Sequence, residues 1–290
     1  MKYIIYILLF FPIWVTAQTY KYIGIEEGLS NRRIFSIQKD AEGYMWFLTN
    51  EGMDRYNGKD IKHYRLNKDD NSLAFPIHLG WIYTNPHIGT WVIGKQGRVF
   101  QYERKYDDFK LVYKLPNSLE TISYGYMDRN NNIWLCRKHS ILLYNTENAQ
   151  ILQFTNILHS NITAIEQVDD HHFFISTETG VRYLKLENGT LKIIPAETLD
   201  YFHVQVNELY YHQASKRLLI GSFERGLFVY DMNNREIIKP EVDLSDVSIT
   251  CMAPLDESQL LISTEGMGVY KININTCQME QYIVANYQSY

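Results

Sequence analysis

The stretch Trp46-Phe-Leu-Thr-Asn-Glu-Gly52-Met-Asp-Arg-Tyr56 joins an apolar run, a polar turn that ends in glycine, and a second run that ends in an aromatic residue. This pattern is typical of two antiparallel strands connected by a tight turn. We expect Gly52 to supply a positive φ in that turn, because glycine adopts such angles without steric cost. The pattern returns five more times, at Trp91 to Tyr102, Trp134 to Tyr144, Phe174 to Leu184, Ile220 to Tyr230 and Leu260 to Tyr270.

The spacing of these copies is about 40 to 46 residues, the period of a four-stranded propeller blade. The 23 Tyr, 13 Phe and 5 Trp also favour strands over helices. We therefore predict an all-β chain, a β-propeller of four-stranded blades with six visible repeats. The expected blades are roughly 31–68, 77–115, 120–155, 161–195, 204–240 and 247–285. A closed six-bladed ring and an incomplete seven-bladed propeller both remain open.

The first residues carry an export signal. Lys2 precedes an apolar run over 3–15, and Val15-Thr16-Ala17 has the small residues of a cleavage site, so residues 1–17 are predicted to be a signal peptide. We expect a periplasmic or cell-envelope protein, with an uncleaved anchor as the alternative. Cys136, Cys251 and Cys277 are too few for a disulfide framework, so we expect buried, inert thiols. A single Cys251–Cys277 bridge is the other possibility.

Several function classes are disfavoured. The net charge of -5 and the lack of a long basic run argue against nucleic-acid binding. No nucleophile elbow, zinc-protease, P-loop or dinucleotide motif occurs, so we predict no enzyme activity and no cofactor. The run from Asp128 to Asn132 and the cluster from Asp169 to His172 could suggest metal ligands. We interpret both as blade turns that use Asp and Asn side chains, and predict no metal site.

The first blade also resembles a known family. It contains Tyr22-Ile-Gly-Ile-Glu-Glu-Gly-Leu-Ser-Asn31, then Ile34-Phe-Ser-Ile-Gln-Lys-Asp40, Gly43-Tyr-Met-Trp-Phe-Leu-Thr49 and Gly52-Met-Asp-Arg-Tyr-Asn-Gly58. This is similar to the opening of the N-terminal periplasmic sensor region, built of regulator-propeller repeats, in hybrid two-component sensor histidine kinases of Bacteroidetes. Later blades match only as a generic propeller repeat. Ser140 replaces the turn glycine of the third blade, and the last three blades lack the leading Trp.

The resemblance implies a sensor of a two-component signal-transduction system that binds an oligosaccharide and forms homodimers. In relatives a second propeller, an immunoglobulin-like domain, a membrane helix, a histidine kinase and a response-regulator domain follow. We therefore expect a periplasmic ligand-sensing propeller that lacks the kinase domains. The alternatives are a secreted polysaccharide lyase or glycosidase, or a scaffold that binds proteins.

Candidate ligand residues lie near the predicted inner strands, which border the channel of a propeller. Aromatic rings stack on the apolar faces of sugars, and polar side chains bind hydroxyl groups. The candidates are Asn31, Arg32, Arg33, His78, Trp81 and Tyr124. For the enzyme alternative the available carboxylates are Glu26, Glu27, Asp40, Glu51 and Asp54, all at turns or edges.

Overall fold

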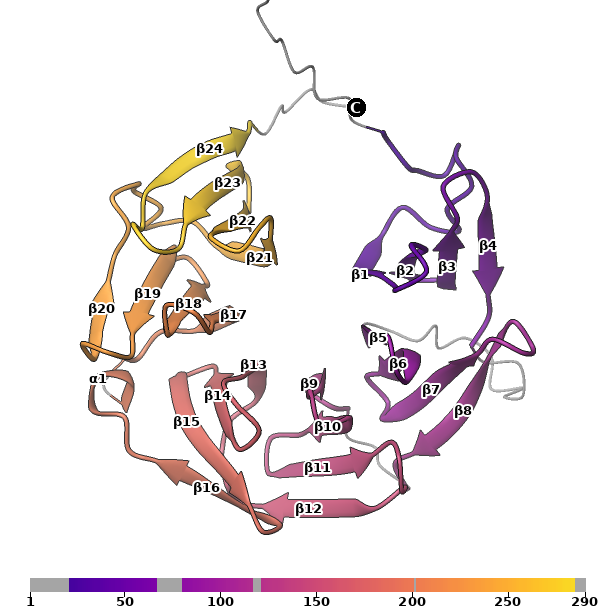
Figure 1. Cartoon of the computed structure of the whole chain (residues 1–290), viewed down its shortest axis with the longest axis horizontal. Coiled ribbons are helices and arrows are strands. Elements are labelled where there is room, and N and C mark those ends of the chain that lie inside the picture. The colour runs from indigo at the N-terminus through magenta and orange to yellow at the C-terminus, as the bar shows by residue number, and fades with distance from the viewer. Residues whose placement is uncertain (1–20, 67–79, 117–120, 201, 285–290) are drawn as a thin grey trace, which may run out of the picture.

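The structure is a computed structural model that describes residues 21–66, 80–116, 121–200 and 202–284. They form six four-stranded antiparallel sheets, each made of four strands consecutive in the chain. Figure 1 shows these sheets as blades arranged around a centre, with the first strand of each blade innermost. The predicted all-β propeller of four-stranded blades is confirmed. The described residues contain one short helix, α1 (Glu197–Asp200), between the fourth and fifth blades.

The blades follow one another around the ring. The first three consist of β1 (Ile34–Lys39), β2 (Met45–Thr49), β3 (Gly52–Tyr56) and β4 (Ile61–Tyr64); β5 (Gly80–Asn85), β6 (Gly89–Gly94), β7 (Arg98–Glu103) and β8 (Asp108–Lys114); and β9 (Tyr124–Met127), β10 (Asn132–Cys136), β11 (Ser140–Asn145) and β12 (Ile151–Thr155). The last three consist of β13 (Ile162–Gln167), β14 (His172–Thr177), β15 (Gly180–Glu187) and β16 (Thr190–Ile194); β17 (Val206–His212), β18 (Arg217–Ser222), β19 (Leu227–Asp231) and β20 (Glu236–Ile238); and β21 (Ile249–Pro254), β22 (Gln259–Thr264), β23 (Gly268–Asn273) and β24 (Met279–Ile283).

The ring is open at one place among the described residues. Neighbouring inner strands contact each other from β1 through β5, β9, β13 and β17 to β21. Figure 1 shows a gap between the sixth blade and the first. Residues that precede β1 cover part of the first blade: Leu29 is buried, and the Ser30 N–H donates to Asp54 Oδ2 at 2.7 Å.

The turn glycine of the first blade has the role expected for it. Gly52 has a φ of 133°, and a Cβ at this position would lie 2.4 Å from the Tyr64 carbonyl oxygen. In the third blade Ser140 closes the corresponding turn, where its carbonyl accepts the Arg137 N–H at 2.8 Å. Ser140 is not among the residues with positive φ, so this turn has a backbone conformation that a residue with a side chain adopts without strain.

Aspartates fix the turns that precede two of the tryptophan strands. Asp128 Oδ1 accepts the N–H groups of Asn130 and Asn132, and its Oδ2 accepts the Trp134 indole N–H at 2.9 Å. Asp40 Oδ2 accepts the Trp46 indole N–H at 2.7 Å in the same way. The interpretation of the run from Asp128 to Asn132 as a blade turn is therefore confirmed. Asp169 likewise accepts the N–H groups at the turn before β14.

Inter-blade packing corrects the repeat alignment in the last two blades. Trp46, Trp91 and Trp134 pack towards the following blade. Ile220 instead packs towards the fourth blade, and its neighbour Leu219 packs towards the sixth. The cause is a longer connection between the second and third strands, which spans 223–226 in the fifth blade and 50–51 in the first. Because side chains alternate between the two faces of a strand, a small change in turn length turns the aligned residue to the opposite face.

One partly buried polar cluster ties the first blade to the second. The Arg55 guanidinium lies over the rings of Tyr44 and Tyr102, 4.7 and 5.5 Å from their centroids. Its Nη1 is 3.0 Å from Asp107 Oδ1, which also accepts the Tyr64 hydroxyl at 2.7 Å. Partial burial acts to raise the pKa of Asp107, but Lys62, Tyr102, Tyr64 and Arg55 together hold it well below its usual range. A charged pair with such partners joins the two blades without leaving an unpaired buried charge.

Candidate functional site in the central channel

The centre of the ring contains a cavity of about 1010 Å³. Residues from β1, β5, β9, β13, β17 and β21 line it, so all six blades contribute. Its lining combines an aromatic wall, a group of polar side chains and several aliphatic side chains. A cavity of this size has room for a small saccharide.

Four aromatic side chains from β5 and β9 form the wall. The Trp81 and Tyr124 rings meet edge to face with centroids 5.3 Å apart, and those of Tyr83 and Tyr126 do so at 6.0 Å. Gly125 permits this packing, since a Cβ there would lie 2.8 Å from the Trp81 ring. The Tyr83 hydroxyl donates to the Gly125 carbonyl at 2.8 Å. The wall is therefore fixed in place before any ligand arrives, which lowers the entropy cost of binding.

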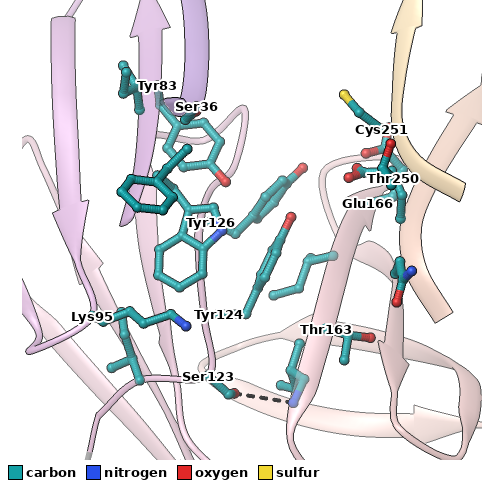
Figure 2. A pocket seen from close by; sticks show the side chains of 18 of the residues that line it. Ser36, Tyr83, Lys95, Ser123, Tyr124, Tyr126, Thr163, Glu166, Thr250 and Cys251 are labelled. Atoms are coloured by element: carbon teal, nitrogen blue, oxygen red, sulfur yellow. Dashed lines mark hydrogen bonds between the residues drawn. The ribbon is translucent and has the colours of Figure 1, made fainter. Parts of the chain in front are cut away.

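Polar side chains from the other inner strands complete the lining. They are Ser36, Gln38, Thr163, Glu166, Asn207, Glu208 and Thr250. Figure 2 shows Glu166 and Thr250 across the cavity from Tyr124 and Tyr126, with Lys95 on the other side of the aromatic group. The Ser123 hydroxyl accepts the Ile162 N–H at 3.2 Å, drawn as the dashed line in Figure 2.

Two carboxyl groups dominate the electrostatics of the channel. Burial raises the pKa of Glu166 to about 8 and that of Glu208 to about 7. One Glu166 oxygen accepts the Tyr211 N–H at 3.3 Å. Burial also raises the pKa of Tyr83 and of Tyr124 well above its ordinary value, so both phenols stay neutral. The interior of the channel therefore disfavours negative charge.

The structure separates the candidate ligand residues into groups. Trp81 and Tyr124 line the channel side by side. Asn31, Arg32 and Arg33 are not among its lining residues: the Asn31 side chain accepts the Arg33 N–H at 2.8 Å, and the two arginines are exposed. His78 lies outside the described residues.

The sequence analysis missed Glu166 and Glu208. The carboxylates it offered for chemistry include Asp40 and Asp54, which instead hold the Trp46 turn and the segment before β1. A signal was present, because Glu166 and Glu208 interrupt the apolar inner strands of the fourth and fifth blades. An acidic residue inside a buried strand needs either a partner or a cavity.

The three cysteines are free. The prediction of a buried thiol is right for Cys136 and wrong for Cys251, which is exposed and lines the channel from β21. Its exposure follows from its place on an inner strand of the sixth blade, which has no described neighbour on its far side. Among the described residues, no group of three or more His, Cys, Asp or Glu is placed to hold a metal ion.

The comparison with protein families finds one match. Residues 28–51, which contain β1 and β2, match the family described as two component regulator propeller. The start of the first blade is therefore similar to a two-component regulator propeller repeat. This confirms the resemblance drawn from the first blade of the sequence. A comparison with curated proteins gave no significant match.

Solved structures share the fold of this propeller. The extracellular domain of BT3049 from B. thetaiotaomicron, described as a hybrid two component system, is 20% identical with a TM-score of 0.71. The extracellular domain of BT4673 from the same organism, described as a one component system, is 19% identical with a TM-score of 0.64. The Saccharomyces cerevisiae protein Sqt1 is 14% identical with a TM-score of 0.63. At these identities the likeness shows the fold.

The matched lengths differ between these structures. The aligned region covers 92% of this chain and 36% of the BT3049 domain, and 89% of this chain and 34% of the BT4673 domain. It covers 89% of this chain and 79% of Sqt1. The chain thus spans about a third of the length of the two bacterial sensor domains. Within its described residues, no helix is long and apolar enough to cross a membrane.

Proposed function

We propose that this regulator propeller is the periplasmic ligand-sensing part of a two-component regulator, exported by residues 1–17, and that it binds a carbohydrate in its central channel. The observation that carries this proposal is the preformed wall of Trp81, Tyr83, Tyr124 and Tyr126 beside polar groups from other blades. Flat rings suit the C–H faces of sugars, and the hydroxyl and amide groups opposite suit their oxygens.

Signalling requires the further domains that family members carry, so the channel would serve as one input of a larger receptor. A ligand that touches several inner strands at once would change how neighbouring blades sit against each other. Such a change is a means of passing occupancy to a downstream propeller or to a second copy of the chain.

Glu166 and Glu208 also raise the question of catalysis, because glycoside hydrolysis uses two carboxyl groups. That chemistry needs one carboxyl group that stays protonated and one that is ionised. In glycosidases the surroundings of the two groups therefore push their pKa values apart. Here burial raises the pKa of both. This favours binding over a lyase or glycosidase activity.

The test is calorimetry against a panel of oligosaccharides, with the variants Trp81→Ala and Tyr124→Ala. Each should weaken binding by about tenfold or more, since each removes a stacking face. Tyr106→Ala is the matched control, because Tyr106 is 66% exposed and lies on the turn between β7 and β8. Binding that is unchanged in both channel variants would place the ligand elsewhere. Release of new reducing ends from any panel member would support the enzyme instead.

A further inference from the structure

The two channel carboxyl groups lie on neighbouring inner strands. Glu166 is on β13 and Glu208 on β17, strands that contact each other, and both side chains line the cavity. Figure 2 shows Glu166 directed towards the cavity from the side opposite the tyrosines. Both side chains are only partly exposed, and the burial of their carboxyl groups raises their pKa.

Neither carboxyl group has a basic partner among the described residues. No lysine, arginine or histidine of this part of the chain forms an ion pair with either of them. Arg129, whose charge acts on Glu166, donates its own hydrogen bonds to Gln167 O at 3.2 Å and Gln213 Oε1 at 3.3 Å. Among the described residues, the Leu209 N–H is the one hydrogen-bond partner of the Glu208 side chain. Acceptor capacity is therefore left over inside the cavity.

The aromatic wall adds a second feature that attracts a cation. Tyr83 and Tyr124 lie close enough to Glu208 for its charge to act on their pKa, and Tyr126 has the same relation to Glu166. The faces of tyrosine rings carry negative electrostatic potential, which attracts ammonium groups. A cation placed between the carboxyl groups and the rings would interact with both.

We propose that the channel selects a saccharide with a free, protonated amino group, held between Glu166 and Glu208 and against the tyrosine faces. This inference rests on the proposed carbohydrate binding and names the class of sugar. The ammonium group would donate charge-assisted hydrogen bonds to the carboxylates, and these are about twice as strong as neutral ones. The sugar ring would stack on Trp81 and Tyr124.

The same groups act against other sugars. An N-acetylated amino sugar is neutral and cannot supply the missing positive charge. A uronic acid or sulfated sugar would bring a negative charge close to two carboxylates, which is unfavourable in a partly enclosed site. Selectivity would therefore come from repulsion of anionic sugars as well as attraction of the amine.

Binding of an amine should release protons. The raised pKa values mean that both carboxyl groups hold protons over part of the neutral range, and a bound ammonium would favour their ionised form. The other titratable groups that line the cavity are Lys95, Glu178, Tyr83, Tyr124, Tyr126 and Cys251. Burial raises the pKa of the three tyrosines, so their hydroxyl groups stay neutral over the neutral pH range.

The experiment is calorimetry of the full chain with three β-1,4-linked trisaccharides: the glucosamine trimer, the N-acetylglucosamine trimer and cellotriose. Measurements at about pH 6.5, in two buffers of different ionisation heat, give both Kd and the protons released. We expect the glucosamine trimer to bind at least about tenfold more tightly than the other two, with release of protons. A trigalacturonate should bind more weakly than any of them.

Variants separate the carboxyl groups from the rest of the site. Glu166→Gln together with Glu208→Gln should remove the preference for the amine and the proton release, while neutral trisaccharides keep their affinity. Glu178→Gln is the matched control, since this exposed cavity carboxylate bonds to Asn161. Neutral sugars that bind as well as the amine, or a preference that survives in the double variant, would overturn the inference and leave the proposed function standing. If no trisaccharide binds, both fail.

Discussion

The substitution Glu166→Gln tests how strongly the channel disfavours negative charge, without any ligand. Glutamine has nearly the same shape as protonated glutamate and keeps an oxygen that can accept the Tyr211 N–H. It stays neutral at every pH. The pH dependence of the difference in free energy of unfolding between the variant and the wild type therefore follows the ionisation of Glu166, including its repulsion by Glu208.

The expected size follows from the raised pKa. The pKa of Glu166 is about 8 in the folded chain, against an ordinary value of 4.5. Below pH 4.5 the carboxyl group is protonated in both states, so its ionisation does not affect stability. Between pH 4.5 and about 8 only the unfolded state releases the proton, so the folded state loses stability as the pH rises. The full difference corresponds to about 5 kcal/mol, and water in the channel screens part of it, so we expect about 2 to 5 kcal/mol.

Urea denaturation followed by tryptophan fluorescence at several pH values between about 4.5 and 8.5 measures this effect. The variant and the wild type should have similar stability at the acid end, and the variant should be the more stable at the alkaline end. Glu178→Gln, which removes an exposed carboxylate of the same cavity, controls for the loss of one charge. A difference that stays flat with pH, or that favours the wild type at alkaline pH, would show that Glu166 ionises without penalty and would refute the reasoning.

Three further outcomes can be checked on the same chain. Gly52→Ala should lower the free energy of unfolding, measured in urea, by more than about 2 kcal/mol, because the added Cβ would lie 2.4 Å from the Tyr64 carbonyl oxygen. Gly43→Ala, where a Cβ has open space, should lower it by about 1 kcal/mol, and an equal loss of stability in the two variants would contradict the prediction. Asp107→Asn should lower the free energy of unfolding by about 1 to 2 kcal/mol at neutral pH. This loss should shrink as the pH falls below 3.8, because the pKa of Asp107 is lowered in the folded chain, and a loss that stays constant with pH would count against a role for the charge of Asp107. In the native chain a thiol reagent should label Cys251 much faster than the buried thiol of the third blade, as peptide mass spectrometry would show; equal rates would contradict the placement of Cys251 in the channel.

The architecture could be predicted because the same pattern of strands and turns returns in each of the six repeats. In the first blade the expected turn glycine, the two strands that it joins and the four-stranded blade all agree with the structure. The alignment fails where turn length varies, as at Ile220, because a short insertion leaves the apolar composition unchanged but turns the aligned side chain to the other face. Apolar composition alone does not reveal which face a residue occupies.

The candidate site could be predicted only in part. Trp81 and Tyr124 were identifiable because they stand at the start of inner strands, which always border the channel of a propeller. Glu166 and Glu208 are about 40 residues apart in the sequence and line one cavity only because the inner strands of successive blades converge at the centre. A search for local motifs does not detect a pair that is created by the ring.

The inner strands also explain why the fold says little about the ligand. On β17, Leu209 packs in the core between blades while its neighbour Glu208 faces the channel, and on β13 the buried Ile165 precedes Glu166 in the same manner. Residues of one inner strand thus contribute both to the packing of blades and to the lining of the channel, and Ile165 does both. Lining residues can change without disturbing the core, so propellers that share 20% identity and the same blade arrangement can hold different ligands. The specificity of this chain has to be sought in Glu166, Glu208 and the aromatic wall.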